Sequence, residues 1–214
     1  AYYKELFQFV YGSTEITEAK LQNALAQFIR SIQSFDSKYD AGRALATNDL
    51  ANFSNFTNQE NTGKNLFLSN PVFDSNSERI SGGLGCNQCH RAPEFDIDPS
   101  SKSNGFGGSL AGTPDVTNTR APSLRNLTTS TGTINGPMMH TAIIKDFQAA
   151  IGHYGNLTNA ALNNSNLDPR LKPNGIGQQL HLTAQEINAV IAFLKTLGGT
   201  DVYSNKKWSN PFPE

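Results

Sequence analysis

The pentapeptide Cys86-Asn87-Gln88-Cys89-His90 decides how this sequence is interpreted. Cys-x-x-Cys-His is the spacing at which a c-type haem is attached to a protein covalently. Each thiol can add to one vinyl group of the porphyrin, and the adjacent histidine then reaches the iron as its proximal ligand. The sequence therefore predicts one covalent haem c, bound by Cys86, Cys89 and His90, with His90 as a ligand of the metal.

Two other uses of a Cys-x-x-Cys pair fit the sequence poorly. A structural zinc site needs about four ligands, whereas the chain has 2 cysteines, and its remaining histidines are scattered: His140, His153 and His181. A thioredoxin-like dithiol would lie within a βαβ pattern, and no such pattern surrounds the motif. Haem attachment is therefore the favoured interpretation.

Length, charge and hydropathy bound the class of protein. The chain has 214 residues, 37% of them hydrophobic, which is enough for a proper core. Its formal net charge of -1 supplies no basic stripe, which argues against nucleic acid as a partner. We see no signal peptide and no hydrophobic run of transmembrane length, so we expect no membrane span and a mature or trimmed chain. Covalent haem attachment takes place outside the bacterial cytoplasm, so the motif predicts a periplasmic or otherwise exported protein.

Helical periodicity accounts for the regular structure in the first part of the chain. Thr17 is a suitable N-cap for one amphipathic helix of about four turns that ends near Ser34. Its apolar positions recur at helical spacing: Leu21, Ala24, Leu25, Phe28 and Ile32. Thr57 and Glu60 have the form of a capping box. The helix that they open is expected to direct Leu66 and Phe67 inward.

Two further helices are predicted after the haem motif. One starts at Asp146 and places four residues on one face: Phe147, Ala150, Ile151 and Tyr154. The last opens with a capping box from Thr183 to Glu186, is stopped by Gly198-Gly199, and buries Ile187, Val190, Ile191 and Leu194.

The remaining sequence predicts irregular structure around these helices. Stretches rich in Gly, Asn, Ser, Thr and Pro cover residues 96–118 and 156–177, and no run of residues indicates a strand. We therefore expect an all-α, cytochrome c-like haem domain with long irregular loops and a helical N-terminal extension. The expected division is residues 1–56 for the extension, 57–205 for the haem domain and 206–214 for a polar tail.

Short motifs also follow one another in an order that one family shares. They lie at residues 3–7, 24–31, 37–40, 63–67, 86–90, 121–126, 137–154 and 192–199. Each is weak by itself, but the ordered set covers nearly the whole chain. It resembles the C-terminal half of the bacterial di-haem cytochrome c peroxidases and of the related MauG-type di-haem enzymes.

This resemblance implies a function for the chain. Proteins of the family carry one haem in each of two cytochrome c-like domains, and the peroxide-reactive haem belongs to the N-terminal domain. The chain would then be the electron-transfer half of an oxidoreductase that reduces hydrogen peroxide with electrons from a small redox protein or another donor. An N-terminal haem domain of the same protein would be its partner, and the single-haem chain alone would have little turnover.

Two alternatives and one metal stay open at this point. The chain could be a stand-alone mono-haem electron carrier, or part of a MauG-like oxidase that acts on a protein or a small organic substrate. The resemblance also leaves open a Ca2+ site between the domains.

The resemblance implies a candidate for the distal iron ligand. Residues 137–142 resemble the family's Pro-Tyr-Met/Phe-His-Asp-Gly segment, although Thr141 and Ala142 replace Asp-Gly. Counting on without a gap places the ligand of the C-terminal haem at Tyr154, where the peroxidases have methionine and MauG-type enzymes have tyrosine. Met139 is the alternative ligand, followed by Met138. A phenolate oxygen would favour ferric iron and lower the potential, whereas a thioether would raise it.

Other residues carry weaker signals. Arg125 could pair with a haem propionate, because a guanidinium matches the carboxylate fork, but an ordinary surface arginine is equally compatible. His140 resembles the histidine near the C-terminal haem of the family, which implies a polar contact near the haem rather than ligation. His153 and His181 are expected at the surface or at helix ends. Trp208 lies in the polar tail and receives no electron-transfer role.

Overall fold

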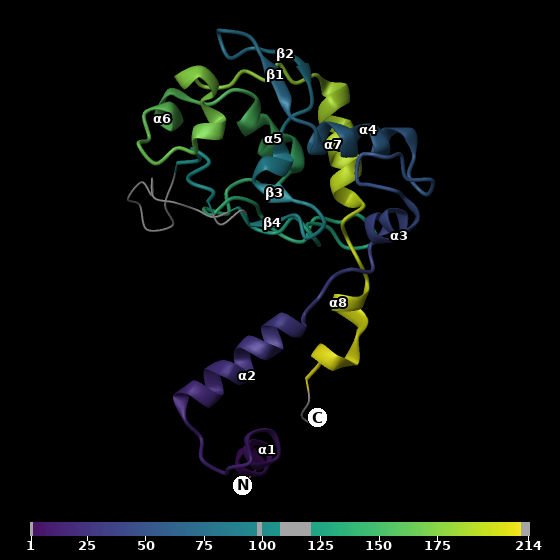
Figure 1. Ribbon diagram of the computed structural model, residues 1–214, viewed down its shortest axis with the longest axis vertical. Coiled ribbons are helices and arrows are strands. Elements are labelled where there is room, and N and C mark those ends of the chain that lie inside the picture. The colour runs from purple at the N-terminus through teal and green to yellow at the C-terminus, as the bar shows by residue number, and fades with distance from the viewer. Residues whose placement is uncertain (1, 98–99, 108–120, 211–214) are drawn as a thin grey trace. The chain divides into compact units, whose positions relative to one another are not determined.

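The computed structural model describes residues 2–97, 100–107 and 121–210 (Figure 1). The chain forms two compact units, the first from Ala1–Ser34 with Asp201–Glu214 and the second from Phe35–Thr200. The expected extension, residues 1–56, is therefore shared between the two units. The reason is that Tyr39 and Phe53 are buried in the core of the second unit.

The first unit is helical. It contains α1 (Tyr2–Tyr11), α2 (Glu18–Ser31), α8 (Asp201–Ser204) and the 3-10 turn η4 (Lys206–Trp208). The predicted start of α2 is confirmed, because the Thr17 side chain accepts a hydrogen bond from the Lys20 backbone N–H. The indole Nε1 of Trp208 donates to Ser31 Oγ at 3.0 Å. Trp208 is thus attached to the end of α2, within the first unit.

The predicted apolar face of α2 is exposed. No residue of this helix is buried, and Leu25 and Phe28 are 55% and 48% exposed. On α1, Phe9 is 89% exposed. Both longer helices of the first unit thus expose large apolar side chains.

The second unit contains five helices among its described residues, and three of the predicted helix starts are confirmed. The caps at Thr57, Asp146 and Thr183 each accept a backbone N–H, and Thr57 and Thr183 form complete capping boxes. The helices are α3 (Lys38–Leu45), α4 (Asn58–Leu68), α5 (Phe147–Gly155), α6 (Asn159–Leu162) and α7 (Ala184–Lys195). Helix α3 was not expected, although Ser37 and Asp40 form a capping box for it.

The fold is mostly helical but not all-α, so that expectation is wrong in one respect. β1 (Pro71–Phe73) pairs with β2 (Arg79–Gly82) in an antiparallel sheet that joins Pro71 to Gly82. β3 (His90–Arg91) pairs in the same sense with β4 (Asp96–Ile97). Strands this short cannot show a period-two pattern in the sequence. The second of these sheets begins at the histidine of the haem motif.

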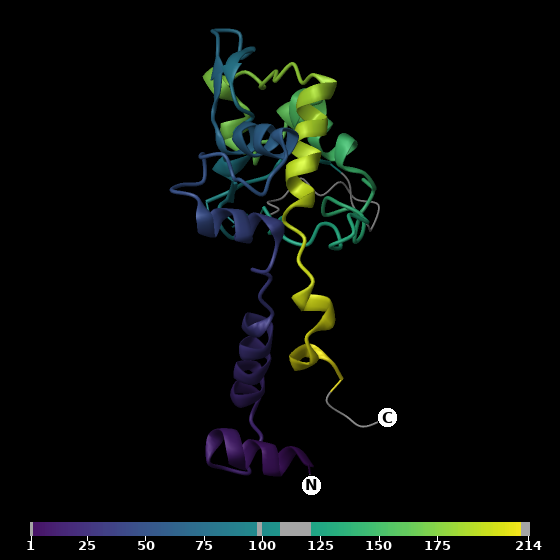
Figure 2. The ribbon, with the colours of Figure 1, turned by 90° about the vertical axis from the view of Figure 1, so that its right-hand side faces the viewer.

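Helices α4 and α7 pack side by side in both views (Figure 1 and Figure 2) and make the most extensive contact between elements. Aromatic rings fill the core around them. The ring centroids of Tyr39 and Phe95 lie 4.8 Å apart, and those of Phe67 and Phe193 lie 5.2 Å apart. Phe67 is 2% exposed, as its predicted inward direction requires. Helix α5 also contacts α7, which brings its apolar face to the same core.

In the described parts of the chain, no helix is both long and apolar enough to pass through a membrane.

Candidate haem-binding site

The two cysteines of the haem motif lie on a single tight turn. Gly85 precedes it with a φ of 71°, and the 3-10 turn η1 (Cys86–Gln88) follows. The Cys89 N–H donates to the Cys86 carbonyl at 3.2 Å. Residues three apart in a 3-10 turn lie one above the other, so both thiols are directed to the same side. Neither cysteine forms a disulfide. Burial, with a smaller effect of Cys89, raises the pKa of the Cys86 thiol to about 12.

His90 is oriented by its backbone surroundings. Its Nδ1 lies 2.9 Å from the Pro122 carbonyl oxygen. Because a carbonyl only accepts hydrogen bonds, this contact places the proton on Nδ1 and leaves a lone pair on Nε2. Burial lowers the pKa of His90 and outweighs the opposite effect of the Pro122 and Phe95 carbonyls. A neutral, oriented imidazole of this kind is the form that binds iron.

Arg170 connects the haem motif to a distant loop. Its Nη1 donates to the Gln88 carbonyl at 2.6 Å, and its Nε and Nη2 donate to the buried carboxylate of Asp168. Burial raises the pKa of Asp168, but hydrogen bonds from Arg170 and the Lys102 backbone outweigh it and hold the pKa below its usual value. The charged pair thus fixes the turn between the two cysteines. The sequence did not indicate Arg170, which lies in an irregular stretch.

A second group of polar and aromatic side chains surrounds Tyr154. We call Asn104, Phe106, Met139, His140, His153 and Tyr154 the distal cluster. Asn104 Nδ2 donates to the Tyr154 hydroxyl at 3.1 Å and to Met139 Sδ at 3.4 Å. The His153 ring lies 5.0 Å from the Tyr154 ring and 5.3 Å from the Phe106 ring, and Phe106 lies 6.3 Å from His140. Tyr154 and Met139, the two distal ligands considered from the sequence, therefore both accept a hydrogen bond from Asn104.

Tyr154 also shares its core cluster with the haem motif. Burial raises the pKa of its hydroxyl to about 12, the hydrogen bond from Asn104 opposes this, and the charges of Cys89 and Cys86 add to it. Tyr154 and Cys86 both pack against the main core cluster. The fold thus brings the predicted distal ligand and the Cys86 thiol, far apart in sequence, to the same core cluster.

The other sequence candidates take different places. Met138 packs against the core, and its N–H donates to the Ile144 carbonyl at 2.6 Å. His140 contacts Phe106 in the distal cluster. His153 lies in the last turn of α5, as expected, and is half-buried, with Nε2 2.8 Å from the Asn104 carbonyl. His181 is exposed, as expected, and its Nε2 lies 3.9 Å from a Glu78 carboxylate oxygen.

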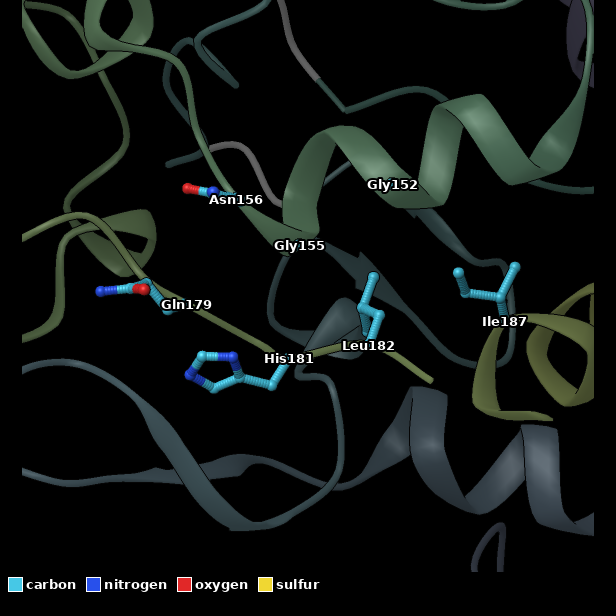
Figure 3. Close-up of a pocket in the computed structure, with 7 residues that line it drawn as sticks. All are labelled: Gly152, Gly155, Asn156, Gln179, His181, Leu182 and Ile187. Carbon is cyan, nitrogen blue, oxygen red and sulfur yellow. The ribbon is translucent and has the colours of Figure 1, made fainter. Parts of the chain in front are cut away.

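A pocket of about 380 Å³ lies on another side of α5. Figure 3 shows it between α5 and the segment from Gln179 to Ile187, with Gly152 and Gly155 on the helix. Gly152 is two residues before Tyr154, which places the two on nearly opposite sides of the helix. None of the haem-motif residues or candidate iron ligands lines this pocket.

Arg125 is bound to another part of the same unit. Its Nη1 and Nη2 donate to the two carboxylate oxygens of Asp40 at 2.9 and 2.8 Å, and its guanidinium lies 4.4 Å from the Phe35 ring. The side chains of Arg125 and Asp40 are only 7% and 18% exposed. These contacts give Arg125 a structural role, and its pairing with a haem propionate stays a prediction.

Asp40→Asn is expected to destabilise the protein in a pH-dependent way. Burial raises the pKa of Asp40, but hydrogen bonds from Arg125 and Ser37 outweigh it and lower the pKa below its usual value. The stabilisation is therefore complete above the unfolded pKa of about 4 and is lost as the pH falls through the lower native value. Thermal unfolding of the holoprotein should show a cost of about 3 kcal/mol at pH 7, which disappears as the pH falls through the lowered native pKa of Asp40.

The exposed pair of Lys20 and Glu15, 3.6 Å apart, supplies the control for this prediction. Glu15→Gln should cost well under 1 kcal/mol. An equal loss of stability for both substitutions at pH 7 would show that the Asp40–Arg125 pair stabilises the fold no more than an exposed ion pair does.

The donor set fits a covalent c-type haem. Two thiols three residues apart on one turn, a neutral histidine with Nε2 available, and a part-buried distal cluster with oxygen and sulfur donors suit such a group. Within the described residues, no group of three or more His, Cys, Asp or Glu side chains could hold another metal ion. A Ca2+ site between domains therefore stays a prediction.

Comparisons with known proteins point in one direction. The family model described as "Di-haem cytochrome c peroxidase" matches residues 1–48. The cytochrome c551 peroxidase of Nitrosomonas europaea is 27% identical over 210 residues, which cover 92% of this chain and 49% of that protein. A solved structure of a MauG-like protein associated with microbial copper homeostasis is 23% identical with a TM-score of 0.59, over 94% of this chain and 63% of that one. The chain therefore spans about half of the length (49%) of the Nitrosomonas europaea peroxidase.

Proposed function

We propose, from its place in the di-haem cytochrome c peroxidase and MauG family, that this chain is the electron-transfer haem domain of a peroxidase-like oxidoreductase. The observation that carries the proposal is that Tyr154 and Cys86, far apart in sequence, both pack partly buried against the same core cluster. The chain thereby offers protein ligands for both axial positions, His90 on one side and Tyr154 or Met139 on the other. A haem with two protein ligands suits electron transfer, because peroxide has no open iron position to occupy.

The chain's own residues prepare the site in three ways. The Pro122 carbonyl holds the His90 proton on Nδ1 and keeps Nε2 directed away from it. Arg170 fixes the turn that carries the thiols. The aromatic core packs against Cys86 and Tyr154 and so provides an apolar wall for the site. A bound haem would supply one-electron exchange between ferric and ferrous iron.

The first unit supports the expectation of a partner domain. The exposed apolar side chains of α1 and α2, including Phe9, Leu25 and Phe28, are suited to packing against another domain. The proposed partner is an N-terminal haem domain of the same protein, which would perform the reaction with peroxide. We further propose that the protein is exported and receives electrons from a small redox protein.

The MauG-like alternative also has support. Tyr154 is the residue type that MauG-type enzymes place at this position, and its hydroxyl is buried in the distal cluster. A second Cys-x-x-Cys-His motif in the full gene would favour either di-haem enzyme over a stand-alone mono-haem carrier.

The isolated chain is expected to show little peroxidase turnover, because His90 and Tyr154 or Met139 would occupy both axial positions of a bound haem. Mixing the haem-loaded chain with hydrogen peroxide and a reduced cytochrome tests this by following cytochrome oxidation. The same chain with Cys86→Ala and Cys89→Ala gives the background without covalent haem. Turnover near that of an ordinary enzyme, about ten per second, would mean that this haem itself reacts with peroxide and that the electron-transfer assignment is wrong.

A further inference from the structure

We propose that Asn104 is the positioning residue of the distal side, and that it holds Met139 beside Tyr154 as a reserve iron ligand. This inference rests on the proposed function, since it concerns a haem bound through His90. It goes further by assigning a role to a residue outside every motif of the chain.

The first step is the shared donor. Asn104 Nδ2 lies 3.1 Å from the Tyr154 hydroxyl and 3.4 Å from Met139 Sδ. An amide nitrogen carries two hydrogens, so it can serve the oxygen and the sulfur at the same time. The two ligand atoms are thus no further apart than the sum of these distances. A small movement of side chains would exchange one for the other.

The second step is that Asn104 is itself held in place. Its Oδ1 accepts the Phe106 backbone N–H at 3.0 Å, which fixes the orientation of the amide and turns Nδ2 toward the ligands. Its backbone carbonyl lies 2.8 Å from His153 Nε2. Because the carbonyl can only accept, His153 donates here. Asn104 is therefore tied to two successive residues of α5, His153 and Tyr154.

The third step is the chemistry of the two ligands. A phenolate oxygen is a hard donor that favours ferric iron, and a thioether is a soft donor that favours ferrous iron. A hydrogen bond donated to the phenolate oxygen withdraws charge from it, so Asn104 should raise the potential above that of an unassisted tyrosinate ligand. If the Tyr154 oxygen is removed, the Met139 sulfur is the remaining candidate iron ligand that Asn104 holds. We expect it then to take the sixth position on the iron.

The first test compares Tyr154→Phe with the double variant Tyr154→Phe, Met139→Leu, both loaded with haem. We expect Tyr154→Phe to stay six-coordinate, with a higher midpoint potential and the ring-current-shifted methyl resonance of an axial methionine in the proton spectrum of the reduced protein. The double variant should lose the sixth ligand and show a five-coordinate, high-spin spectrum. Met139→Leu alone should leave the wild-type ferric spectrum nearly unchanged.

The second test isolates Asn104. Asn104→Asp keeps the acceptor for the Phe106 N–H but removes both donated hydrogens, and Asn104→Leu removes the donor without adding charge. Both should lower the midpoint potential of the tyrosine-bound protein. In the Tyr154→Phe background, both should produce a five-coordinate fraction, because Met139 is no longer held. Circular dichroism of each variant separates these effects from loss of fold.

Asn164→Asp is the matched control. The Asn164 amide donates to Ser103 Oγ at 3.0 Å and its oxygen accepts the Asn166 N–H, so it makes the same kind of contacts without touching a candidate ligand. The haem midpoint potential of Asn164→Asp should differ from that of the wild type by less than the potential of Asn104→Asp does.

The outcomes separate this inference from the proposed function. The positioning role is wrong if the haem of Tyr154→Phe becomes five-coordinate and the Met139 methyl resonance shows no ring-current shift. It is also wrong if Asn104→Asp and Asn104→Leu change the midpoint potential no more than Asn164→Asp does. In either case the proposed haem function stands. If the wild-type chain takes up no covalent haem, the proposed function fails, and this inference fails with it.

Discussion

Cys86→Ala combined with Cys89→Ala is expected to abolish covalent haem binding completely. Both thiols lie on the same turn and neither forms a disulfide, and the sequence contains no further cysteine to replace them. The wild-type chain should exceed the mass of its polypeptide by one haem and keep its colour through acid-acetone extraction. The double variant should have the polypeptide mass and lose any colour on extraction.

Single cysteine variants and a substitution of a histidine outside the motif serve as controls for this prediction. Cys86→Ala or Cys89→Ala alone should leave at most one thioether and reduce the yield of haem-bound chain. His181→Gln changes an exposed histidine outside the haem motif and should leave mass and colour as in the wild type. Haem that stays covalently attached to the double variant would contradict the assignment of the motif.

Gly63→Ala is expected to give the largest loss of stability among glycine substitutions in the helices. A Cβ at this position would overlap the backbone carbonyl of Ala189, where α4 packs against α7. Backbone cannot rotate away as a side chain can, so the two helices must separate. Overpacking of this kind costs about 3 kcal/mol, against a gain of about 1 kcal/mol from replacing a helical glycine.

Gly152→Ala is the matched control for this substitution. Gly152 is also within a helix, α5, but no atom lies within 4 Å of the position of its Cβ. Thermal unfolding of the haem-loaded chain should therefore show a lower midpoint for Gly63→Ala, by roughly 4 to 8 °C for a net loss of about 2 kcal/mol, and an equal or higher midpoint for Gly152→Ala. Equal midpoints for Gly63→Ala and the wild type would show that the helices do not meet as closely as described.

The helix starts could be predicted because their causes are local. The side chains of Thr17, Thr57, Asp146 and Thr183 each accept a hydrogen bond from a backbone N–H three residues on. The haem motif is local for the same reason, since its thiols and histidine lie within five consecutive residues. The family resemblance, which rests on several such motifs in order, is supported by the comparisons.

Where the sequence misled, the cause was an interaction that extends beyond the local segment. The residues of α2 have the apolar periodicity of a packed helix, yet none of them is buried, because periodicity cannot tell which molecule or domain covers a face. The strand pairs β1–β2 and β3–β4 were not predicted, because each strand is only two to four residues long and shows no periodic pattern.

The amino-acid sequence by itself determined the haem motif, the four predicted helix starts and the inward face of Phe67, since each depends on neighbours within a turn or two. Only the tertiary structure decided the surroundings of the site. Asn104 and Tyr154 are 50 positions apart, and Arg170 and Gln88 are 82 apart. Arg125 and Asp40 are separated by 85 positions. Such pairs leave no periodic signal, because the packing of α4, α5 and α7 around one aromatic core sets which distant polar groups can meet.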